Sequence, residues 1–539
     1  MRLRTERACR NYVLLLLIVA LTGCAQPGKT TVSTNRIVYG LTLSPSGFDP
    51  HRGESSELGI PMRQVYDTLI YRHPENGRFV AGLAEIPQIS EDRMTYTFTL
   101  KQGVTFHDGT PFNAEAVAAN FDRIVAPETQ STKALTLLGP YTGYEINGEY
   151  SISIKLSEPY SPLLDALSQV YLGMASPTAF RQYTPEIYQF HQVGTGPYML
   201  ESLLLDNYLI LKRNLDYTWG PEFYESPTVQ SIDEIEYRFY SDSATRFEKM
   251  EQGLAQVMGE IPPLTARAQA SNSRIRILPA SIPGQPLQFM INTQRPPTNN
   301  LAFRQALLYG TNREAIVDLV FQGFSSVAYG PITSSTQFYN PGVSGYYPYN
   351  AVQAQQLLTS LGYTDADNNG YLDLPDGSDL NLDILVPPWG MVPQVAQTLQ
   401  SQWSSLKIKV NLISVPDLST LAARVQEGEY HLVAFYSFGV DPSLLNPFFT
   451  TQGSRNWMGY SNPDLDQVLL EATRQLDTGV RSQLYTQAQQ IIMENALILP
   501  IREYVNLNGV SNQVENLQFD SFGWFPLMYN ARLAVPAAP

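Results

Sequence analysis

Residues 96–124 read YTFTLKQGVTFHDGTPFNAEAVAANFDRI, and they contain a strand, a turn and a helix start in immediate succession. Apolar and threonine residues alternate over 96–100, which predicts a half-buried strand. The tripeptide at 107–109 is His-Asp-Gly, a turn in which glycine supplies backbone freedom. Asn113 then precedes apolar residues at helical spacing, as an N-cap does. The stretch therefore predicts a strand followed by a capped helix, with His107 as a structural turn residue.

The same two periodicities alternate along the rest of the chain. Period-two patterns that predict strands occur at 152–156, 235–239 and 408–412. Helical patterns occur at 354–361, where Gly362 follows, and at 465–472. Neither a repeat nor a low-complexity block interrupts this order. The fold class is therefore α/β, in the sense of mixed α+β.

Further blocks occur in a fixed order along the chain: GTGPY at 194–198, INT at 291–293, FRQAL at 303–307, AQQLLTSLGY at 354–363, Asp441-Pro442 and YSNP at 460–463. Together with 96–124 they resemble the extracellular solute-binding proteins, family 5, of the oligopeptide, dipeptide and nickel class. These proteins are receptors of ABC importers. The resemblance covers nearly the whole chain after the N-terminal segment. Gly194 to Tyr198 lacks the Lys and Ser/Thr of a phosphate-binding loop, so we interpret it as a crossover between domains.

The resemblance implies a periplasmic-binding-protein-like type II fold with an extra inserted domain, in which two lobes close over a cleft. Lobe I would be discontinuous and would consist of residues 36–56, 192–285 and 500–539. Lobe II would be inserted at residues 57–191, and lobe III would span residues 286–499. Closure of the lobes about a hinge would trap the ligand.

The N-terminus predicts export and lipid anchoring. Residues 1–23 combine several arginines with the short apolar run VLLLLIVAL, too short for a bilayer span, as in a signal peptide. The run ends in Leu-Thr-Gly-Cys at 21–24, which resembles the bacterial lipobox with Cys24 as the lipidated residue. The alternative is an incidental thiol in an ordinary signal peptide. Residues 24–35 would form a polar tether, so the protein would be a membrane-anchored lipoprotein facing the periplasm or the cell exterior.

Charge and residue content narrow the function classes. The formal net charge is −15, which argues against nucleic acid or an anionic lipid surface as a partner. The five histidines are scattered, and we find no HExxH helix, GxSxG elbow or Cys–His pair. We therefore predict that the chain is not an enzyme and requires no cofactor.

The sequence DADNNGYLDLPD, which starts at residue 365, has the spacing of a calcium loop. The oxygen ligands at positions one, three, five, seven and twelve would come from Asp365, Asp367, Asn369, Tyr371 and Asp376. Position twelve is Asp, which is shorter than the usual Glu. Two interpretations stay open: a structural calcium site, and a polar Asp/Asn/Gly turn without metal.

One residue position, 438, indicates which kind of solute the chain binds. In peptide-binding members of the family, an acid four residues before the proline that aligns with Pro442 pairs with the peptide's amino terminus. That position is Phe438 here, while the aromatic residue three positions earlier is kept as Phe435. A phenyl ring offers only a cation–π face to an ammonium group. A peptide held by its free amine is therefore disfavoured, unless Asp441 substitutes for the missing acid.

We expect aromatic loop residues with a few polar neighbours to form the cleft wall. Arg455 could hold a carboxylate, and core packing is the alternative for each aromatic ring. The candidate ligand-binding residues are Phe48, Trp389, Phe435, Tyr436, Phe438, Asp441, Arg455, Asn456 and Trp457.

The sequence thus predicts a monomeric substrate-binding component of an ABC import system, with a permease and an ATPase as partners. The solute would be a small molecule, with a peptide as the first candidate and a sugar or a metal chelate as alternatives. A lipoprotein sensor that reports to a signalling partner is the second function class.

Overall fold

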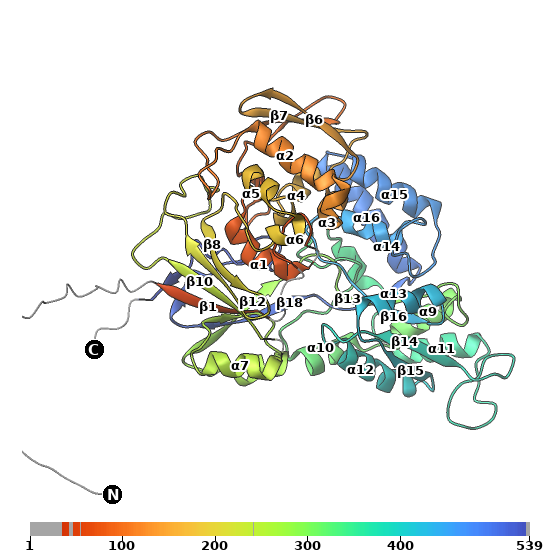
Figure 1. The fold of residues 1–539 in the computed structure, drawn as a ribbon. Coiled ribbons are helices and arrows are strands. Elements are labelled where there is room, and N and C mark those ends of the chain that lie inside the picture. The colour runs from red at the N-terminus through yellow and green to blue at the C-terminus, as the bar shows by residue number, and fades with distance from the viewer. Residues whose placement is uncertain (1–34, 42–46, 54, 241, 535–539) are drawn as a thin grey trace, which may run out of the picture. The chain divides into compact units, whose positions relative to one another are not determined.

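Three β-sheets organise the computed structural model of the chain (Figure 1). The structure describes residues 35–41, 47–53, 55–240 and 242–534. The described residues belong to one compact unit. The predicted signal segment, Cys24 and residues 24–34 of the predicted tether lie outside the described residues.

The first sheet has seven strands in the order β12-β18-β11-β1-β10-β9-β8. Strand β1 is parallel to β10 and β11, and the other pairs are antiparallel. Helices α7 (Ser243–Glu251) and α8 (Pro263–Ala268) belong to this part of the chain. The strands are β1 (Arg36–Leu41), β8 (Tyr198–Leu204), β9 (Tyr208–Arg213), β10 (Glu234–Phe239), β11 (Val257–Met258), β12 (Ile275–Ser281) and β18 (Val505–Ser511).

The second sheet has four strands in the order β4-β5-β7-β6. Its strands are β4 (Gln88–Ile89), β5 (Thr95–Thr99), β6 (Tyr141–Gly148) and β7 (Ser151–Leu156), and a separate hairpin pairs β2 (Ile70–Arg72) with β3 (Phe79–Ala81). The helices of this part are α1 (Ser56–Val65), α2 (Ala114–Val125), α3 (Lys133–Leu138), α4 (Leu163–Ala166), α5 (Pro177–Gln182) and α6 (Pro185–Tyr188), with 3₁₀ turns at Pro127–Thr129 and Val170–Leu172.

The third sheet has five strands in the order β15-β14-β16-β13-β17. The strands are β13 (Leu287–Ile291), β14 (Asn381–Val386), β15 (Lys409–Ser414), β16 (Leu432–Ala434) and β17 (Ile498–Arg502). Its helices are α9 (Leu301–Tyr309), α10 (Arg313–Phe321), α11 (Ala351–Ser360), α12 (Val392–Ser404), α13 (Leu418–Glu427), α14 (Asn446–Phe449), α15 (Pro463–Arg474) and α16 (Thr478–Glu494), with 3₁₀ turns at Pro341–Gly345 and Pro442–Leu445. Two short strands further along the chain, β19 (Val514–Glu515) and β20 (Arg532–Leu533), form a separate antiparallel pair.

The predicted secondary structure is confirmed for the elements named above. The strand predicted at 96–100 is β5, and the helix predicted after Asn113 is α2, where the Asn113 side chain accepts a hydrogen bond from the Ala116 amide. The strands predicted at 152–156, 235–239 and 408–412 are β7, β10 and β15, and the helical patterns are α11 and α15. Local periodicity was sufficient here because each element buries one face against a core.

Two passages of chain connect the seven-stranded sheet with the five-stranded sheet. One leads from β12 to β13 and the other from β17 to β18. The passages lie side by side, because the Ile282 amide donates to the Tyr504 carbonyl at 2.9 Å. Strand β17 runs across residues 499 and 500, where the sequence placed a lobe boundary, and ends at Arg502.

The GTGPY segment packs tightly against the end of α1. A Cβ atom on Gly194 would lie 2.1 Å from the Val65 carbonyl oxygen, and one on Gly196 would lie 2.6 Å from that of Gln64. His107 joins this contact, since its Nδ1 accepts from the Gly194 amide and its Nε2 lies 2.9 Å from the Gly196 carbonyl. The structure thus gives His107 a structural role in holding the GTGPY segment.

Candidate ligand-binding site

Four aromatic rings meet beside the two connecting passages, and we call them the aromatic cluster: Tyr436, Phe438, Tyr504 and Trp524. Ring centroids lie 4.8 Å apart for Phe438 and Tyr504, 5.6 Å for Phe438 and Trp524, and 5.7 Å for Tyr436 and Tyr504. Tyr436 packs against both of the large hydrophobic cores. The cluster therefore joins the five-stranded sheet to the seven-stranded sheet and the C-terminal segment.

The backbone around Phe438 is fixed by the passage from β12 to β13. The Gln285 amide donates to the Ser437 carbonyl at 2.8 Å, and the Ser437 amide donates to the Gln285 side chain at 2.9 Å. Gly284 has a φ of 123°, and a Cβ atom there would lie 2.6 Å from the Ser437 carbonyl oxygen. Only glycine permits this approach, which sets the position of Phe438.

Trp389 is connected to the cluster through the next residue, Gly390. A Cβ atom on Gly390 would lie 1.9 Å from the Tyr436 hydroxyl oxygen, and Gly390 has a φ of 62°. Trp389 itself is half-buried and packs on the core of the five-stranded sheet. The structure thus brings the backbone beside Trp389 against Tyr436.

The aromatic cluster combines accessible rings with unused hydrogen-bond donors. Tyr436 and Phe438 are half-buried, whereas Tyr504 and Trp524 are buried. Within the described residues, Trp524 Nε1 and Gln285 Nε2 are buried without a hydrogen-bond partner. An unpaired buried donor is costly, so an acceptor group or a water is the natural occupant beside it. Burial raises the pKa of the Tyr436 hydroxyl, as does neighbouring Tyr504, so Tyr436 stays neutral.

Phe435, Arg455 and Trp457 lie together at a different place. The Phe435 ring centroid is 4.9 Å from that of Trp457 and 6.0 Å from that of Phe448, within the core of the five-stranded sheet. The Arg455 guanidinium lies 5.0 Å from the Phe435 ring centroid. Successive residues of an extended chain point to opposite sides, which separates Phe435 from Tyr436.

Asn456 and Asp441 have structural partners. The Asn456 side chain donates to the Tyr460 carbonyl at 2.7 Å and accepts from the Tyr460 amide, so it holds the loop around Trp457. The Asp441 carboxylate accepts two hydrogen bonds from Arg481 at 2.9 and 3.0 Å and also caps the turn at Ser443. Because Asp441 is buried in this ion pair, its charge is already compensated.

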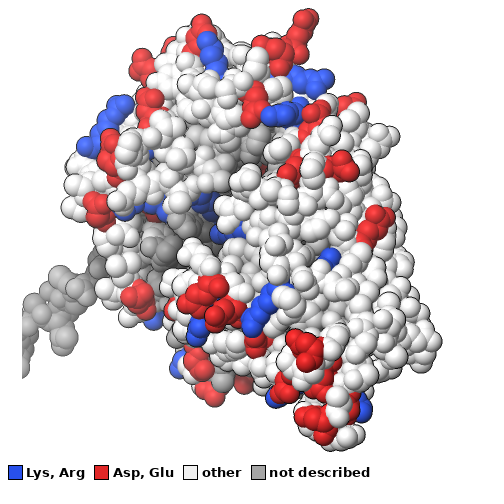
Figure 2. All heavy atoms as spheres, turned by 90° about the vertical axis from the view of Figure 1, so that its right-hand side faces the viewer, with Lys and Arg blue, Asp and Glu red and all other residues white. Residues whose placement is uncertain are grey.

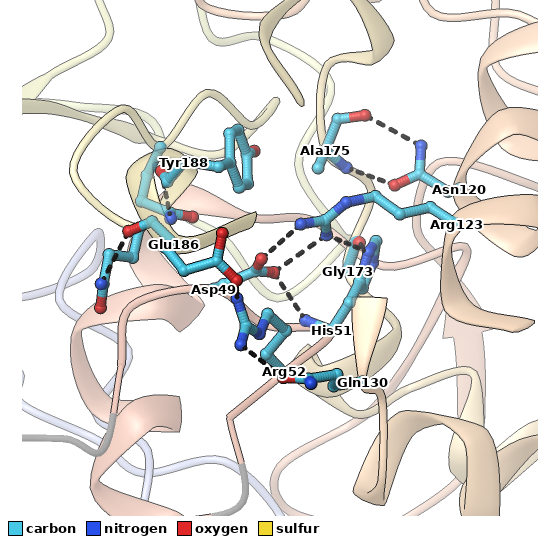
Figure 3. Close-up of polar contacts among 12 residues, drawn as sticks. Asp49, His51, Arg52, Asn120, Arg123, Gln130, Gly173, Ala175, Glu186 and Tyr188 are labelled. Atoms are coloured by element: carbon cyan, nitrogen blue, oxygen red, sulfur yellow. Dashed lines mark hydrogen bonds and ion pairs between the residues drawn. The ribbon is translucent and has the colours of Figure 1, made fainter. Parts of the chain in front are cut away.

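Phe48 is fully buried and lies against Phe239, with 6.4 Å between ring centroids. The residue after it begins a polar cluster that the sequence did not reveal (Figure 3). Asp49 pairs with Arg123 of α2 through both carboxylate oxygens. Arg123 also donates to Nδ1 of His51 at 2.8 Å, so the Nε2 proton of His51 points to the Gly173 carbonyl at 3.0 Å. This cluster holds residues 49–51 against α2.

The polar cluster keeps His51 neutral. Burial, followed by the charge of Arg123, lowers the pKa of His51 to about 4. An Asp-Pro-His run after a strand was the only available signal in the sequence, and Arg123 lies too far along the chain to be linked to it by local pattern.

The predicted calcium loop has its oxygen groups engaged with protein partners. Asp365 accepts from Lys407 Nζ at 3.0 Å and from the Gly370 amide at 3.3 Å. The Asp367 and Asn369 side chains each accept from the backbone two residues on, and Asp376 accepts from Ser378. Tyr371 is exposed. Among the described residues, no three His, Cys, Asp or Glu side chains are grouped so that they could hold a metal ion.

The surface shows hollows of different kinds. A shallow one of about 590 Å³ lies along α11 beside Leu406, and one of about 410 Å³ lies between α5 and β8. None of the candidate ligand-binding residues lines either of them. Figure 2 shows a hollow in one face of the molecule, with Lys and Arg side chains visible at its edge. No helix in the described part of the chain is both long and apolar enough to cross a membrane.

Comparison with known proteins gives a consistent result. Residues 78–459 match the model of the bacterial extracellular solute-binding proteins, family 5 Middle. The chain is 30% identical over 439 residues to the glutathione-binding protein GsiB of Salmonella typhi. This alignment covers 78% of the chain and 79% of GsiB.

Solved structures share the fold. NikA from Brucella suis, in complex with Fe(III)-EDTA, matches with a TM-score of 0.83 at 21% identity and covers 93% of this chain and 100% of its own. The dipeptide-binding protein from Pseudoalteromonas sp. SM9913, in complex with Met-Leu, matches with a TM-score of 0.75 at 22% identity over the same shares.

These matches confirm the predicted α/β fold of the periplasmic-binding-protein type, with two lobes. They also confirm the prediction of a solute-binding component of an ABC importer and not an enzyme. The chain belongs to the bacterial extracellular solute-binding proteins, family 5.

Proposed function

We propose that this chain is an exported lipoprotein, anchored through Cys24, that binds a small solute between its lobes and delivers it to an ABC permease. A peptide is the first candidate solute, and the relatives named for glutathione and dipeptide binding support this choice. The observation that carries the proposal is the aromatic cluster, because it lies beside the two connecting passages and includes Tyr436 and Phe438. The protein acts as a monomer.

The chemistry of the cluster favours a solute whose docked end carries no ammonium group. Phe438 contributes a ring, and the Asp441 carboxylate is already paired with Arg481. The unpartnered donors Trp524 Nε1 and Gln285 Nε2 suit a carbonyl, hydroxyl or carboxylate oxygen. Aromatic faces with a few polar groups are typical of small-molecule sites.

The first test is mass spectrometry of the solute that remains bound through native purification. It is followed by calorimetric titration with dipeptides and with the same dipeptides acetylated at the amine. The acetylated compounds should bind at least as tightly as the free ones. Absence of a retained solute, together with no binding of peptides, sugars or metal chelates, contradicts the receptor proposal.

Phe438→Asp should reverse the preference. A carboxylate at this position would add a charge-assisted hydrogen bond to a free amine, which is worth about tenfold in affinity. Phe438→Asn is the matched control, since it has the same size without the charge and should leave free and acetylated dipeptides equally bound. If both variants respond alike, position 438 does not contact the docked end of the solute.

Lipid anchoring is tested separately. Cells that express the wild-type chain should incorporate labelled palmitate into it and retain it in the membrane fraction. The Cys24→Ser variant should lose the label and be released. A variant that stays labelled would place the lipid elsewhere.

A further inference from the structure

The turn that follows β7 contacts the C-terminal end of α15. Figure 1 shows α15 beside the part of the molecule that carries β6 and β7. The Ser161 amide donates to the Thr473 carbonyl at 2.7 Å, and the Ser161 hydroxyl donates to the Ala472 carbonyl at 3.3 Å. The last carbonyls of a helix have no partner within the helix. Ser161 thus caps α15 from a part of the molecule that is built on another sheet.

An ion pair stands beside this cap. Arg474, in the last turn of α15, donates from Nε and Nη2 to one oxygen of Glu158, at 2.9 and 2.6 Å. Both side chains are 48% exposed. Arg93 adds a hydrogen bond to the Gln475 side chain at 3.2 Å. We call residues 158–161 and 472–475 the clasp.

The clasp shares an atom with the support of the aromatic cluster. The Ala472 carbonyl accepts from Arg481 Nε at 3.0 Å as well as from Ser161. Arg481 in turn holds the carboxylate of Asp441, three residues after Phe438. Formation of the clasp and the position of the loop that carries Phe438 therefore depend on the same end of α15.

We infer that the clasp holds the part built on the four-stranded sheet against α15, and that Glu158, Ser161 and Arg474 thereby set how long a solute remains bound. This inference rests on the proposed function. These three are positioning residues: they stabilise the closed arrangement of the two parts and act on the bound solute only indirectly. If a solute binds only the closed arrangement, its apparent affinity scales with the closed fraction.

The experiment reverses the ion pair one residue at a time and then on both sides. The variants are Glu158→Arg, Arg474→Glu and the double variant E158R/R474E. Lys155→Glu is the matched control, because Lys155 and Glu145 form a similarly exposed ion pair within the four-stranded sheet. All are made in the full chain.

Hydrogen exchange of the peptide that contains Ser161 reports the clasp directly, since its amide is protected by the Thr473 carbonyl. Solute release is measured with glutathione and Met-Leu as probes and with the solute that copurifies. Each single reversal should speed both exchange and release by about 2- to 5-fold, the range that an exposed ion pair supports. The double variant should return to within about twofold of wild type, and the control should not change.

The outcomes separate the two proposals. Single reversals that behave like the Lys155→Glu control overturn the clasp while solute binding stands. Faster exchange without faster release overturns its role in retention. If neither the copurifying solute nor a probe binds, the proposed function and the retention role fail together, while the exchange data still decide whether the clasp holds α15.

Discussion

His51 has its two ring nitrogens committed to Arg123 and to the Gly173 carbonyl. Its pKa is about 4 in the folded chain and 6.5 when unperturbed. Between these values the unfolded chain binds the additional proton, so the contribution of His51 to stability is complete above pH 6.5 and is lost as the pH falls toward 4. The loss amounts to roughly 2 to 3 kcal/mol at pH 4.5.

His51→Gln should flatten this part of the pH dependence, because an amide can accept from Arg123 and donate to the Gly173 carbonyl without titrating. The measurement is urea unfolding at pH 7.5 and pH 4.5. His191→Gln, at an exposed histidine stacked on Tyr183, is the control. Asp520 contributes to the pH dependence of stability with the opposite sign. Burial raises the pKa of its carboxyl to about 6, so the folded chain binds this proton more readily than the unfolded chain does. An unchanged pH profile in His51→Gln would contradict the assignment.

Gly390 is the second residue whose replacement has a defined consequence. Gly390→Ala introduces a Cβ atom 1.9 Å from the Tyr436 hydroxyl at a positive φ, and it should destabilise the fold by about 1 to 3 kcal/mol. Tyr436→Phe removes the clashing hydroxyl, so the double variant should recover part of the loss. Urea unfolding of the two single variants and the double variant gives the coupling. If the changes in unfolding free energy of the two single variants simply add in the double variant, Tyr436 is not the reason that residue 390 must be glycine.

At the scale of elements, the 365–376 loop can be tested for calcium. Lys407 already neutralises Asp365, and the other carboxylates accept from neighbouring groups. We therefore expect millimolar calcium to leave the thermal midpoint of the wild type unchanged. Asp365→Ala should lower the midpoint by a small amount, since it removes an exposed contact. A rise with calcium that is absent in Asp365→Ala would establish the metal site.

The secondary-structure elements were predicted from the sequence more completely than the candidate site was. Strands such as β5 and β7 and helices such as α2 and α15 follow from periods of two and 3.6, which are local properties. The candidate site depends on longer distances along the chain. Tyr436 and Phe438 could be named, but Tyr504 and Trp524 approach them only through the second passage and the C-terminal segment.

Two further features of the site were inaccessible for the same reason. Nothing local indicates that Arg481 reaches Asp441, or that Arg123 reaches Asp49. Phe435 and Tyr436 were assigned to the same wall from the sequence, although neighbours in an extended chain face opposite sides and this rule could have separated them. Physical contacts between distant segments are decided by tertiary packing, which one sequence without its fold does not contain.

At the scale of the whole molecule, the C-terminal segment 516–534 is a structural part of the fold. It carries buried residues that include Trp524, Phe525 and Met528, and its Pro526 carbonyl accepts from the Gln64 side chain of α1 at 2.8 Å. A chain that ends at Glu515 loses several buried large side chains, each worth about 1.5 to 3 kcal/mol. That loss rivals the net stability of a domain.

The shortened chain should therefore unfold without a sharp transition and be degraded rapidly by added protease. Circular dichroism during heating and timed proteolysis are the measurements. A chain that ends at Ala534 is the control and should behave as the full chain does. Cooperative unfolding of the chain that ends at Glu515 would show that the segment is dispensable.

The order of strands in the seven-stranded sheet also governs when folding can finish. Strand β18 lies between β12 and β11, and β11 lies beside β1. Synthesis proceeds from the N-terminus, so the first strand of the chain must wait for almost the last one before its sheet is complete, and long-range pairing of this kind is slow. A chain that stalls before residue 505 leaves β11 and β12 with open edges, which other chains can pair with before the missing strand arrives.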